Sequence, residues 1–127
     1  MTVTHLNPPA LHRNPAFSQG TIAPAGRTLY VGEQNGTDGA GQIAGGLEEQ
    51  TVQALRNVLA VLEEGGASVA DVVKLTIYLA ESVDPNEAFR ASAEVWGMNP
   101  TAVTVLKVAA LARPEALVGI EAVASLG

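Results

Sequence analysis

The chain has 127 residues, no cysteine and a formal net charge of −6 at pH 7. This length favours one domain over residues 1–127, and the lack of cysteine excludes disulfides, thiolate metal sites and a cysteine nucleophile. The seven Lys and Arg residues are scattered and do not form a basic face, which argues against nucleic acid as a partner. The N-terminus lacks a signal-peptide pattern and no apolar run approaches the ~18 residues of a membrane span, so a cytoplasmic protein without a membrane partner is expected.

The first third of the chain is expected to hold short strands and loops. Residues 2–6 alternate polar and apolar side chains, as a short edge strand does, and residues 11–19 contain an Asn-Pro turn typical of a loop. Residues 21–23 are predicted to pair with residues 27–31 as a hairpin, because the Pro-Ala-Gly segment between them favours a turn. The second and third strands should therefore be neighbours.

Residues 32–42 are rich in glycine and are interpreted as a mobile loop. The segment could be mistaken for a phosphate-binding loop. However, no Gly-Lys-Ser or Gly-Lys-Thr follows it, and its glycines lack the spacing of a dinucleotide fingerprint. Nucleotide binding is therefore not expected here.

Two amphipathic helices are predicted. Over residues 47–64, apolar side chains recur every three or four positions, two glutamates stand in the first turn, and a Gly-Gly pair follows as a stop signal. The second helix should cover residues 85–96, because Asp84 is a suitable N-cap, a proline stands in the first turn, and Gly97 follows. The apolar stripe of the first helix is expected to face the core.

Three further strands are predicted. Residues 73–79 alternate strictly, with aliphatic side chains on one face and polar or aromatic ones on the other. The β-branched run over residues 99–111, opened by an Asn-Pro turn, is interpreted as the central strand of the sheet. Residues 117–124 form a last strand that is apolar throughout except at Glu121. Together these elements predict an α+β fold, with a mixed β-sheet and both helices packed on one of its faces.

Three stretches of the chain carry a further signal: residues 99–111 together with 113–124, the loop Pro15-Ala16-Phe17-Ser18-Gln19, and the segment Val31-Gly32-Glu33-Gln34. These stretches resemble the RidA (YjgF/YER057c/UK114) family, also called the endoribonuclease L-PSP family. The resemblance extends from residue 7 to residue 124. It implies the chorismate-mutase-like fold, in which three subunits join their sheets into a closed barrel and small-molecule clefts lie between the subunits.

Deaminating members of this family hydrolyse 2-aminoacrylate-type enamines and imines to 2-keto acids without a metal or a cofactor. The resemblance implies that their carboxylate-binding arginine corresponds to Val103, and that the glutamate that positions water corresponds to Gly119. Their asparagine in the second helix corresponds to Phe89, their cleft tyrosine to Phe17, and a glycine at the rim of their cleft to Glu33. The chain is therefore expected to be a divergent hydrolase or deaminase-like homotrimer, and not a standard 2-iminobutanoate/2-iminopropanoate deaminase.

The candidate ligand cleft comprises Phe17, Glu33, Gln34, Phe89, Val103, Thr104, Gly119 and Glu121. Without the arginine, a carboxylate ligand would lose a charge-assisted contact worth about 1.5–3 kcal/mol, so a neutral or cationic small molecule is expected. Alternatives remain open for the two acids. Glu33 either faces the cleft or points to solvent, and Glu121 is either a structural carboxylate or a site acid with a raised pKa.

Other residues carry weaker functional signals. His5 and His12 have no pair of carboxylates nearby in the sequence that would complete a metal site, and Ser18 and Thr104 lack an evident base partner. A non-catalytic homotrimer that binds a small metabolite or a partner protein stays open as the alternative function. Ribonuclease activity, attributed to some family members, is disfavoured by the scattered basic residues.

Overall fold

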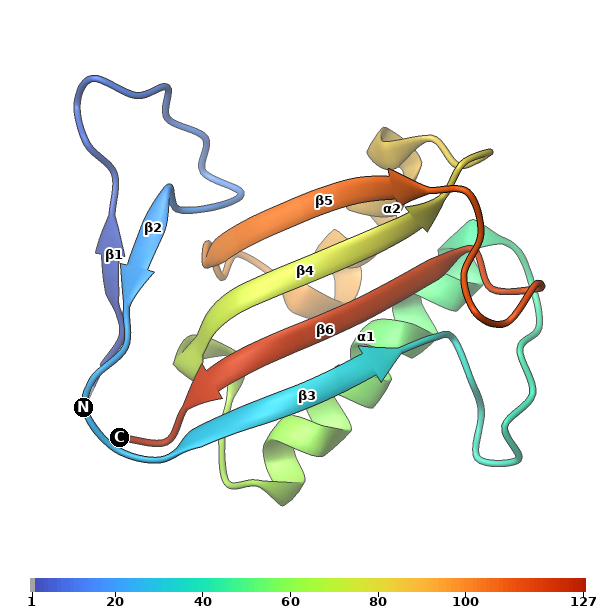
Figure 1. Cartoon of the computed structure of the whole chain (residues 1–127), viewed down its shortest axis with the longest axis horizontal. Coiled ribbons are helices and arrows are strands. Elements are labelled where there is room, and N and C mark those ends of the chain that lie inside the picture. Colours follow the sequence, from blue (N-terminus) through green and yellow to red (C-terminus); the bar gives the residue numbers. More distant parts are fainter. Residues whose placement is uncertain (1) are drawn as a thin grey trace.

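The computed structural model describes residues 2–127, which fold around a four-stranded mixed β-sheet (Figure 1). The elements in chain order are β1 (Thr4–Leu6), β2 (Gly20–Ile22), β3 (Thr28–Gln34), α1 (Leu47–Glu64), a 3-10 turn (Val69–Asp71), β4 (Val72–Ala80), α2 (Pro85–Trp96), β5 (Ala102–Val108) and β6 (Val118–Ser125). The strand order in the sheet is β3-β6-β4-β5, with β4 and β5 parallel and the other neighbours antiparallel. β1 and β2 pair with each other outside this sheet.

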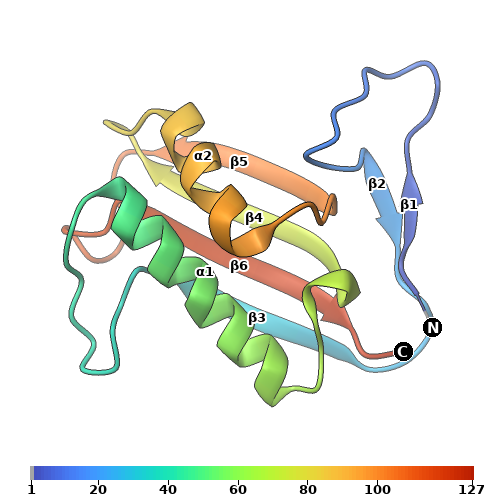
Figure 2. The same ribbon diagram turned by 180° about the vertical axis from the view of Figure 1, so that it is seen from behind.

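Both helices cover the same face of the sheet, as the sequence predicts (Figure 2). The apolar stripe of α1 enters the core, where Leu55, Val58 and Leu62 lie in one buried cluster with Val118 and Ile120 of β6. Figure 1 looks onto the opposite face, which no helix of the described part of the chain covers. We refer to it as the open face.

The helix boundaries follow from local signals in the sequence. α1 spans residues 47–64 as predicted, and in its first turn the Gly46 N–H donates to Glu49 Oε2 at 2.8 Å. After its end, Gly66 adopts a left-handed φ of +81°, which favours glycine. Asp84 caps α2 as predicted by accepting a backbone N–H at 2.9 Å. Within residues 2–127, neither helix is long and apolar enough to cross a membrane.

The prediction that residues 99–111 form the central strand is wrong. β5 lies at the edge of the sheet and β4 is its partner there, whereas β6 and β4 are the two central strands. A β-branched composition fits any pleated surface, so it does not distinguish an edge strand from a central one. The 50% exposure of Val105 reflects this edge position. The last strand takes a central place instead, with its even-numbered residues 118–124 buried under the helices.

The predicted hairpin between residues 21–23 and 27–31 is also wrong. β2 pairs antiparallel with β1, and β3 pairs antiparallel with β6. The Pro-Ala-Gly segment does redirect the chain, but a turn signal does not determine which strands it joins. β6 offers β3 a long, buried partner, while the short β1–β2 hairpin stands beside the sheet (Figure 1). A hydrogen bond of 2.5 Å from Thr21 Oγ1 to the Val73 carbonyl ties the hairpin to β4.

The glycine-rich loop between β3 and α1 lacks regular structure, as expected, but several hydrogen bonds hold it. Asp38 Oδ1 accepts two backbone N–H groups of the same loop, both at 2.9 Å. Asn57 Nδ2 of α1 donates to the Thr37 carbonyl at 2.9 Å, and Arg113 Nη1 donates to the Gly41 carbonyl at 2.6 Å. The loop is thus joined to α1 and to the segment before β6.

Candidate functional site

The open face carries polar side chains in the middle of two mostly apolar strands. In the pairing of β4 with β6, Tyr78 lies opposite Gly119, and the residue before Ile77 lies opposite Glu121. Side chains alternate along a strand, and Ile77 and Ile120 pack in the core. Tyr78, Gly119 and Glu121 therefore point away from the helices.

A hydrogen bond joins the two polar side chains of these strands. The phenol of Tyr78 donates to Glu121 Oε1 at 2.6 Å. This bond raises the pKa of Tyr78 above its ordinary value, and desolvation and the charges of Glu121 and Glu33 act in the same direction. The phenol therefore stays protonated around neutral pH and holds one oxygen of Glu121, which is half-buried.

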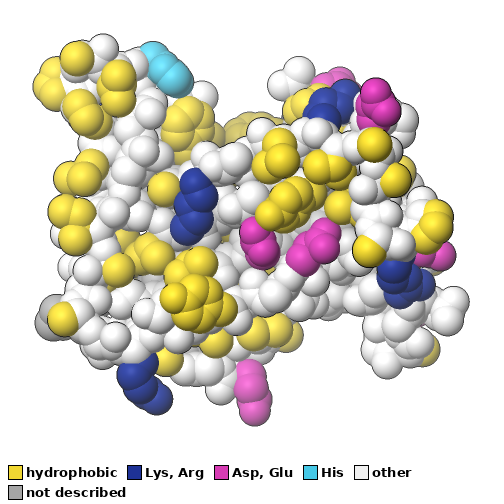
Figure 3. Space-filling model, viewed as in Figure 1, with side chains coloured by type: hydrophobic (Ala, Val, Ile, Leu, Met, Phe, Trp, Pro, Cys, Tyr) yellow, Lys and Arg dark blue, Asp and Glu magenta, His cyan; other side chains and the backbone are white. Residues whose placement is uncertain are grey.

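Glu33 reaches the same place from β3. The register between β3 and β6 shifts between Val31 and Gln34, and such a bulge redirects a side chain. A Cβ atom at Gly119 would overlap the Glu33 carboxylate, so this carboxylate lies directly over Gly119. We refer to Glu33, Tyr78 and Glu121, grouped around Gly119, as the acid site. Figure 3 shows two acidic side chains side by side in the middle of the open face.

No cation of residues 2–127 forms an ion pair with the acid site. The ion pair that this part of the chain does contain joins Arg113 to Glu115 at 3.2 Å, in the segment before β6. Lys74 shares the open face, but its Nζ donates to Thr104 Oγ1 at 2.7 Å. On β4, Lys74 stands two residues before Thr76, which lies opposite Glu121, and this is about 7 Å along a strand. The acid site therefore carries two carboxylates without an ion-paired cation.

The structure separates two neighbouring candidates, Val103 and Thr104. Val103 lies opposite Leu75 and packs against the core, on the face that the helices cover. Thr104 lies on the open face, where it accepts the hydrogen bond from Lys74. The residue aligned with the family arginine therefore does not face the acid site, which the alternation of side chains along β5 explains.

Three other candidates do not reach the acid site of the same chain. Gln34 Nε2 donates to the Gly32 carbonyl at 3.1 Å, within its own strand. Phe17 lies in the loop between β1 and β2, edge-on to His12 with ring centroids 6.0 Å apart. Phe89 belongs to α2, behind the sheet, and is 57% exposed.

Ser18 has a partner that the sequence did not reveal. His5 Nδ1 lies 2.9 Å from Ser18 Oγ, and the prediction that Ser18 lacks a base partner is wrong in this respect. However, the hydroxyl donates to the Pro100 carbonyl at 2.5 Å, and the Ser18 N–H donates to the Thr101 carbonyl at 2.9 Å. Ser18 is only 3% exposed. It anchors the N-terminal loop to the start of β5 and is not open to a substrate.

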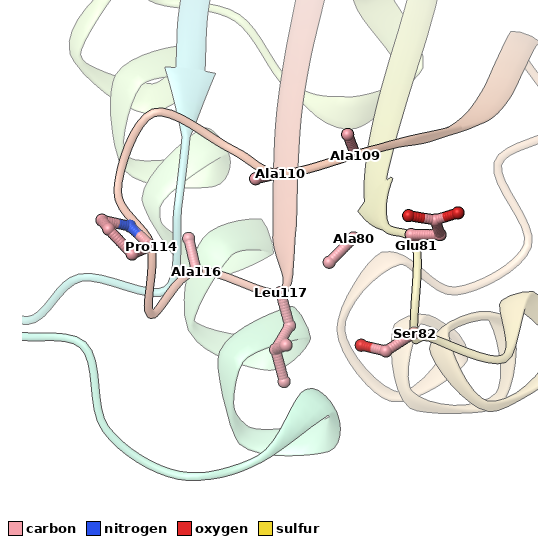
Figure 4. A pocket seen from close by; sticks show the side chains of 8 residues that line it. All are labelled: Ala80, Glu81, Ser82, Ala109, Ala110, Pro114, Ala116 and Leu117. Atoms are coloured by element: carbon pink, nitrogen blue, oxygen red, sulfur yellow. The ribbon is translucent and has the colours of Figure 1, made fainter.

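A hollow of about 410 Å³ opens at the carboxyl ends of β4 and β5 (Figure 4). Four alanines, a proline and a leucine line it, together with Glu81 and Ser82 from the turn that leaves β4. Two of its residues, Ala80 and Leu117, are joined by a backbone hydrogen bond of 2.9 Å. Because the strands are antiparallel, Ala80 stands two residues after Tyr78, and Leu117 stands two residues before Gly119, at the same end of the sheet. The hollow therefore lies next to the acid site.

Tyr78 and Glu81 are the site residues that sequence analysis missed. The alternation over residues 73–79 places Tyr78 on the second face of its strand, but its contact with Glu121 spans 43 positions and depends on the strand register. Nothing in the sequence around Glu81 distinguishes it from a surface acid. Within residues 2–127, no group of three His, Cys, Asp or Glu side chains could hold a metal ion.

Known proteins resemble this chain over most of its length. Residues 8–126 match the family model described as Endoribonuclease L-PSP. The chain is 36% identical to the 2-iminobutanoate/2-iminopropanoate deaminase of Homo sapiens over 113 residues, which cover 87% of this chain and 80% of that protein. It is 35% identical to a RutC family protein of Pyrococcus abyssi over 82 residues, which cover 65% of this chain and 64% of that protein.

The fold leads to the same family. The crystal structure of a Rid family protein of unknown function from Yersinia pestis matches with a TM-score of 0.88 at 35% identity, covering 99% of this chain and 100% of that one. That protein shares the two helices packed on a mixed sheet. The chain therefore belongs to the endoribonuclease L-PSP family, the RidA family that its sequence resembles.

Proposed function

We propose that this chain forms a homotrimer that hydrolyses carbon–nitrogen double bonds of small molecules in clefts between its subunits. Its substrate is a neutral imine or a cationic iminium ion without a carboxylate, which separates it from a standard 2-iminobutanoate/2-iminopropanoate deaminase. Glu33 is the proton-transfer group, and Tyr78 and Glu121 complete the site. This chemistry needs only acid–base groups and water.

The contact between Glu33 and Gly119 carries the proposal. In the deaminating members that the sequence resembles, position 119 holds the glutamate that positions water, and position 33 holds a glycine. In this chain the two residue types are exchanged, and the Glu33 carboxylate occupies the space beside Gly119. A carboxylate is thereby kept at the same place, although β3 supplies it instead of β6.

Glu33 can transfer a proton in each half of the reaction. As a water oxygen attacks the carbon of the protonated C=N group, the carboxylate accepts a proton from that water. The protonated Glu33 then donates to the nitrogen of the carbinolamine, and the C–N bond breaks. The amine or ammonia leaves, and the hydroxyl proton passes to solvent as the carbonyl forms. Glu33 suits this role better than Glu121, because the Tyr78 phenol already engages Glu121.

The charge of the site supports a cationic or neutral substrate. The two carboxylates of the site attract an iminium ion and repel a ligand that carries a carboxylate. Both electrostatic interactions become stronger as a cleft excludes water. Val103 supplies no positive charge, and the Lys74 ammonium donates to Thr104 instead of pairing with either carboxylate. The imino acids after which the human relative is named, which carry a carboxylate, are therefore not substrates of this chain.

Exposed apolar side chains on the open face support the trimer. Tyr30 is 74% exposed and Leu106 is 37% exposed, and their strand pairings place both on the open face. Two further copies would bury this surface and create three equivalent clefts. Phe17 lies at the other end of the sheet from the acid site of its own chain, so it would contribute to the cleft of a neighbouring copy.

Iminium ions generated by an amine oxidase test the proposed activity, with imino acids from an amino-acid oxidase as the comparison. We expect the purified protein to accelerate hydrolysis of the amine-derived ions only. Glu33→Gln should lower this rate by about 10²- to 10⁴-fold, the usual contribution of a general base. Glu94→Gln, which removes an exposed carboxylate on α2 behind the sheet, should not change it. Equal rates for imino acids, or full activity of Glu33→Gln, would contradict the proposal.

A non-catalytic trimer that binds a small amine is the second candidate. The hydrogen bond from Tyr78 to Glu121 favours it, because one of the two acids is already engaged. This candidate predicts that amines raise the melting temperature of the protein saturably, while no iminium ion is hydrolysed faster than in buffer. The same preparations distinguish the two functions.

A further inference from the structure

The hollow at the ends of β4 and β5 points to a narrower substrate class. We infer that the chain accepts imines derived from short aliphatic diamines, with Glu81 holding the second, non-reacting ammonium group. The inference rests on the proposed function, because it takes the reacting C=N group to lie over Gly119. It deepens that function by using a part of the cleft beyond the acid site.

The lining of the hollow fits a short hydrocarbon chain. Four of its residues offer only methyl groups, and Pro114 and Leu117 add further apolar surface; the four are Ala80, Ala109, Ala110 and Ala116. A volume of about 410 Å³ lies within the range of small-molecule sites, about 300–1,000 Å³. No arginine or lysine lines this hollow, so it offers a carboxylate no partner.

Polar groups stand at one rim of the hollow. Glu81 and Ser82 occupy the turn after β4, and Figure 4 shows them on the opposite side of the hollow from Pro114. Lys107 lines a smaller adjoining hollow together with Glu81, but it forms no ion pair with it. The Glu81 carboxylate is therefore available to an ammonium group at the end of a ligand.

The spacing along the strands connects this rim to the acid site. Ala80 and Leu117 lie one two-residue step beyond Tyr78 and Gly119, which is about 7 Å. A ligand whose C=N group lies over Gly119 would extend over these two side chains toward Glu81. It would meet a carboxylate at each end and methyl groups between them. This arrangement matches a nitrogen at both ends of a chain of four or five carbon atoms, one of which is the carbon of the C=N group.

Calorimetric titration at low ionic strength tests the inference with butylamine and 1,4-diaminobutane as probes. The diamine should bind about four- to tenfold more tightly than butylamine. Its two equivalent ends give a statistical factor of about two, and one exposed ion pair with Glu81 gives the remainder. In Glu81→Gln this ratio should fall to about two. In Glu94→Gln, which removes the same charge elsewhere, the ratio should stay as in the unchanged protein.

Ala110→Leu provides a second variant, because a larger side chain would fill the hollow without touching the acid site. It should weaken the binding of butylamine and of the diamine relative to methylamine. A diamine advantage of no more than twofold in the unchanged protein, or an advantage that survives Glu81→Gln, would overturn the inference. If butylamine binds without any diamine advantage, or if no amine binds, the inference fails. The proposed function is decided separately, by the hydrolysis of amine-derived iminium ions.

Discussion

The two faces of the sheet are built from the same strands but differ in burial and polarity. On the helix-covered face, Leu79 and Ile120 pack with Leu55 of α1, and each is at most 1% exposed. On the open face, the neighbouring positions hold Tyr78 and Glu121, which remain accessible and carry the polar groups of the site. Because side chains alternate along a strand, one residue contributes to stability and the next can take part in chemistry. The helix-covered face should therefore respond to mutation in stability, and the open face in function.

The largest expected effect is on the helix-covered face. Leu55→Ala should lower the free energy of unfolding by about 2–5 kcal/mol, because it removes apolar contacts and leaves a cavity in the core. Met98→Ala, at a side chain that is 74% exposed, should change it by less than about 0.5 kcal/mol. Urea denaturation at one protein concentration measures both. Similar losses in the two variants would show that the buried cluster does not dominate stability.

A smaller effect is expected on the open face. Gly119→Glu should lower the free energy of unfolding by about 0.5–1 kcal/mol, because its Cβ would overlap the Glu33 carboxylate and would push this exposed, flexible side chain aside. Combining Gly119→Glu with Glu33→Gly should recover most of the lost stability, since the effects of substitutions at two contacting residues are not additive. Additive losses in the double variant would mean that Glu33 does not lie over Gly119.

The smallest expected effect is a change in pH dependence. The hydrogen bond to Glu121 raises the pKa of Tyr78, so the folded protein holds this proton more tightly than the unfolded chain. The resulting stability is present below the ordinary tyrosine pKa of about 10 and is lost as the pH rises through the raised value. Spectroscopic titration of Tyr30→Phe, in which Tyr78 is the remaining tyrosine, should give a midpoint above 10. Adding Glu121→Gln should lower that midpoint, and an unchanged midpoint would argue against the bond.

Periodicity was sufficient to predict the helix-covered face. The three- and four-residue spacing in residues 47–64 and the cap at Asp84 located both helices, and alternation located β4. Strand pairing was not predictable in the same way. The Pro-Ala-Gly turn suggested a local hairpin, whereas β3 pairs with β6 at the far end of the chain. Such contacts depend on which buried surfaces fit together, and a single sequence does not state this.

The open face was predicted only in part. Glu33, Gly119 and Glu121 were candidates through the family resemblance, and the structure brings them together. Their partner Tyr78 could not be identified, because its contact with Glu121 depends on the register between β4 and β6. Val103 was expected beside them, but alternation along β5 turns it toward the core. The resemblance already places a glutamate at position 33 and a glycine at position 119, but only the bulge in β3 shows that the Glu33 carboxylate lies over Gly119.

In the proposed function, the site carboxylate comes from position 33 in place of position 119. The most direct test is the rate at which an amine-derived iminium ion is hydrolysed by the unchanged protein, Glu33→Gly, Gly119→Glu and the double variant. We expect Glu33→Gly to lose activity because its carboxylate is gone, and Gly119→Glu to lose activity because two carboxylates compete for one place. The double variant should recover most of the rate, since a single carboxylate again lies beside residue 119. A double variant as inactive as Glu33→Gly, or a fully active Glu33→Gly, would contradict the claim.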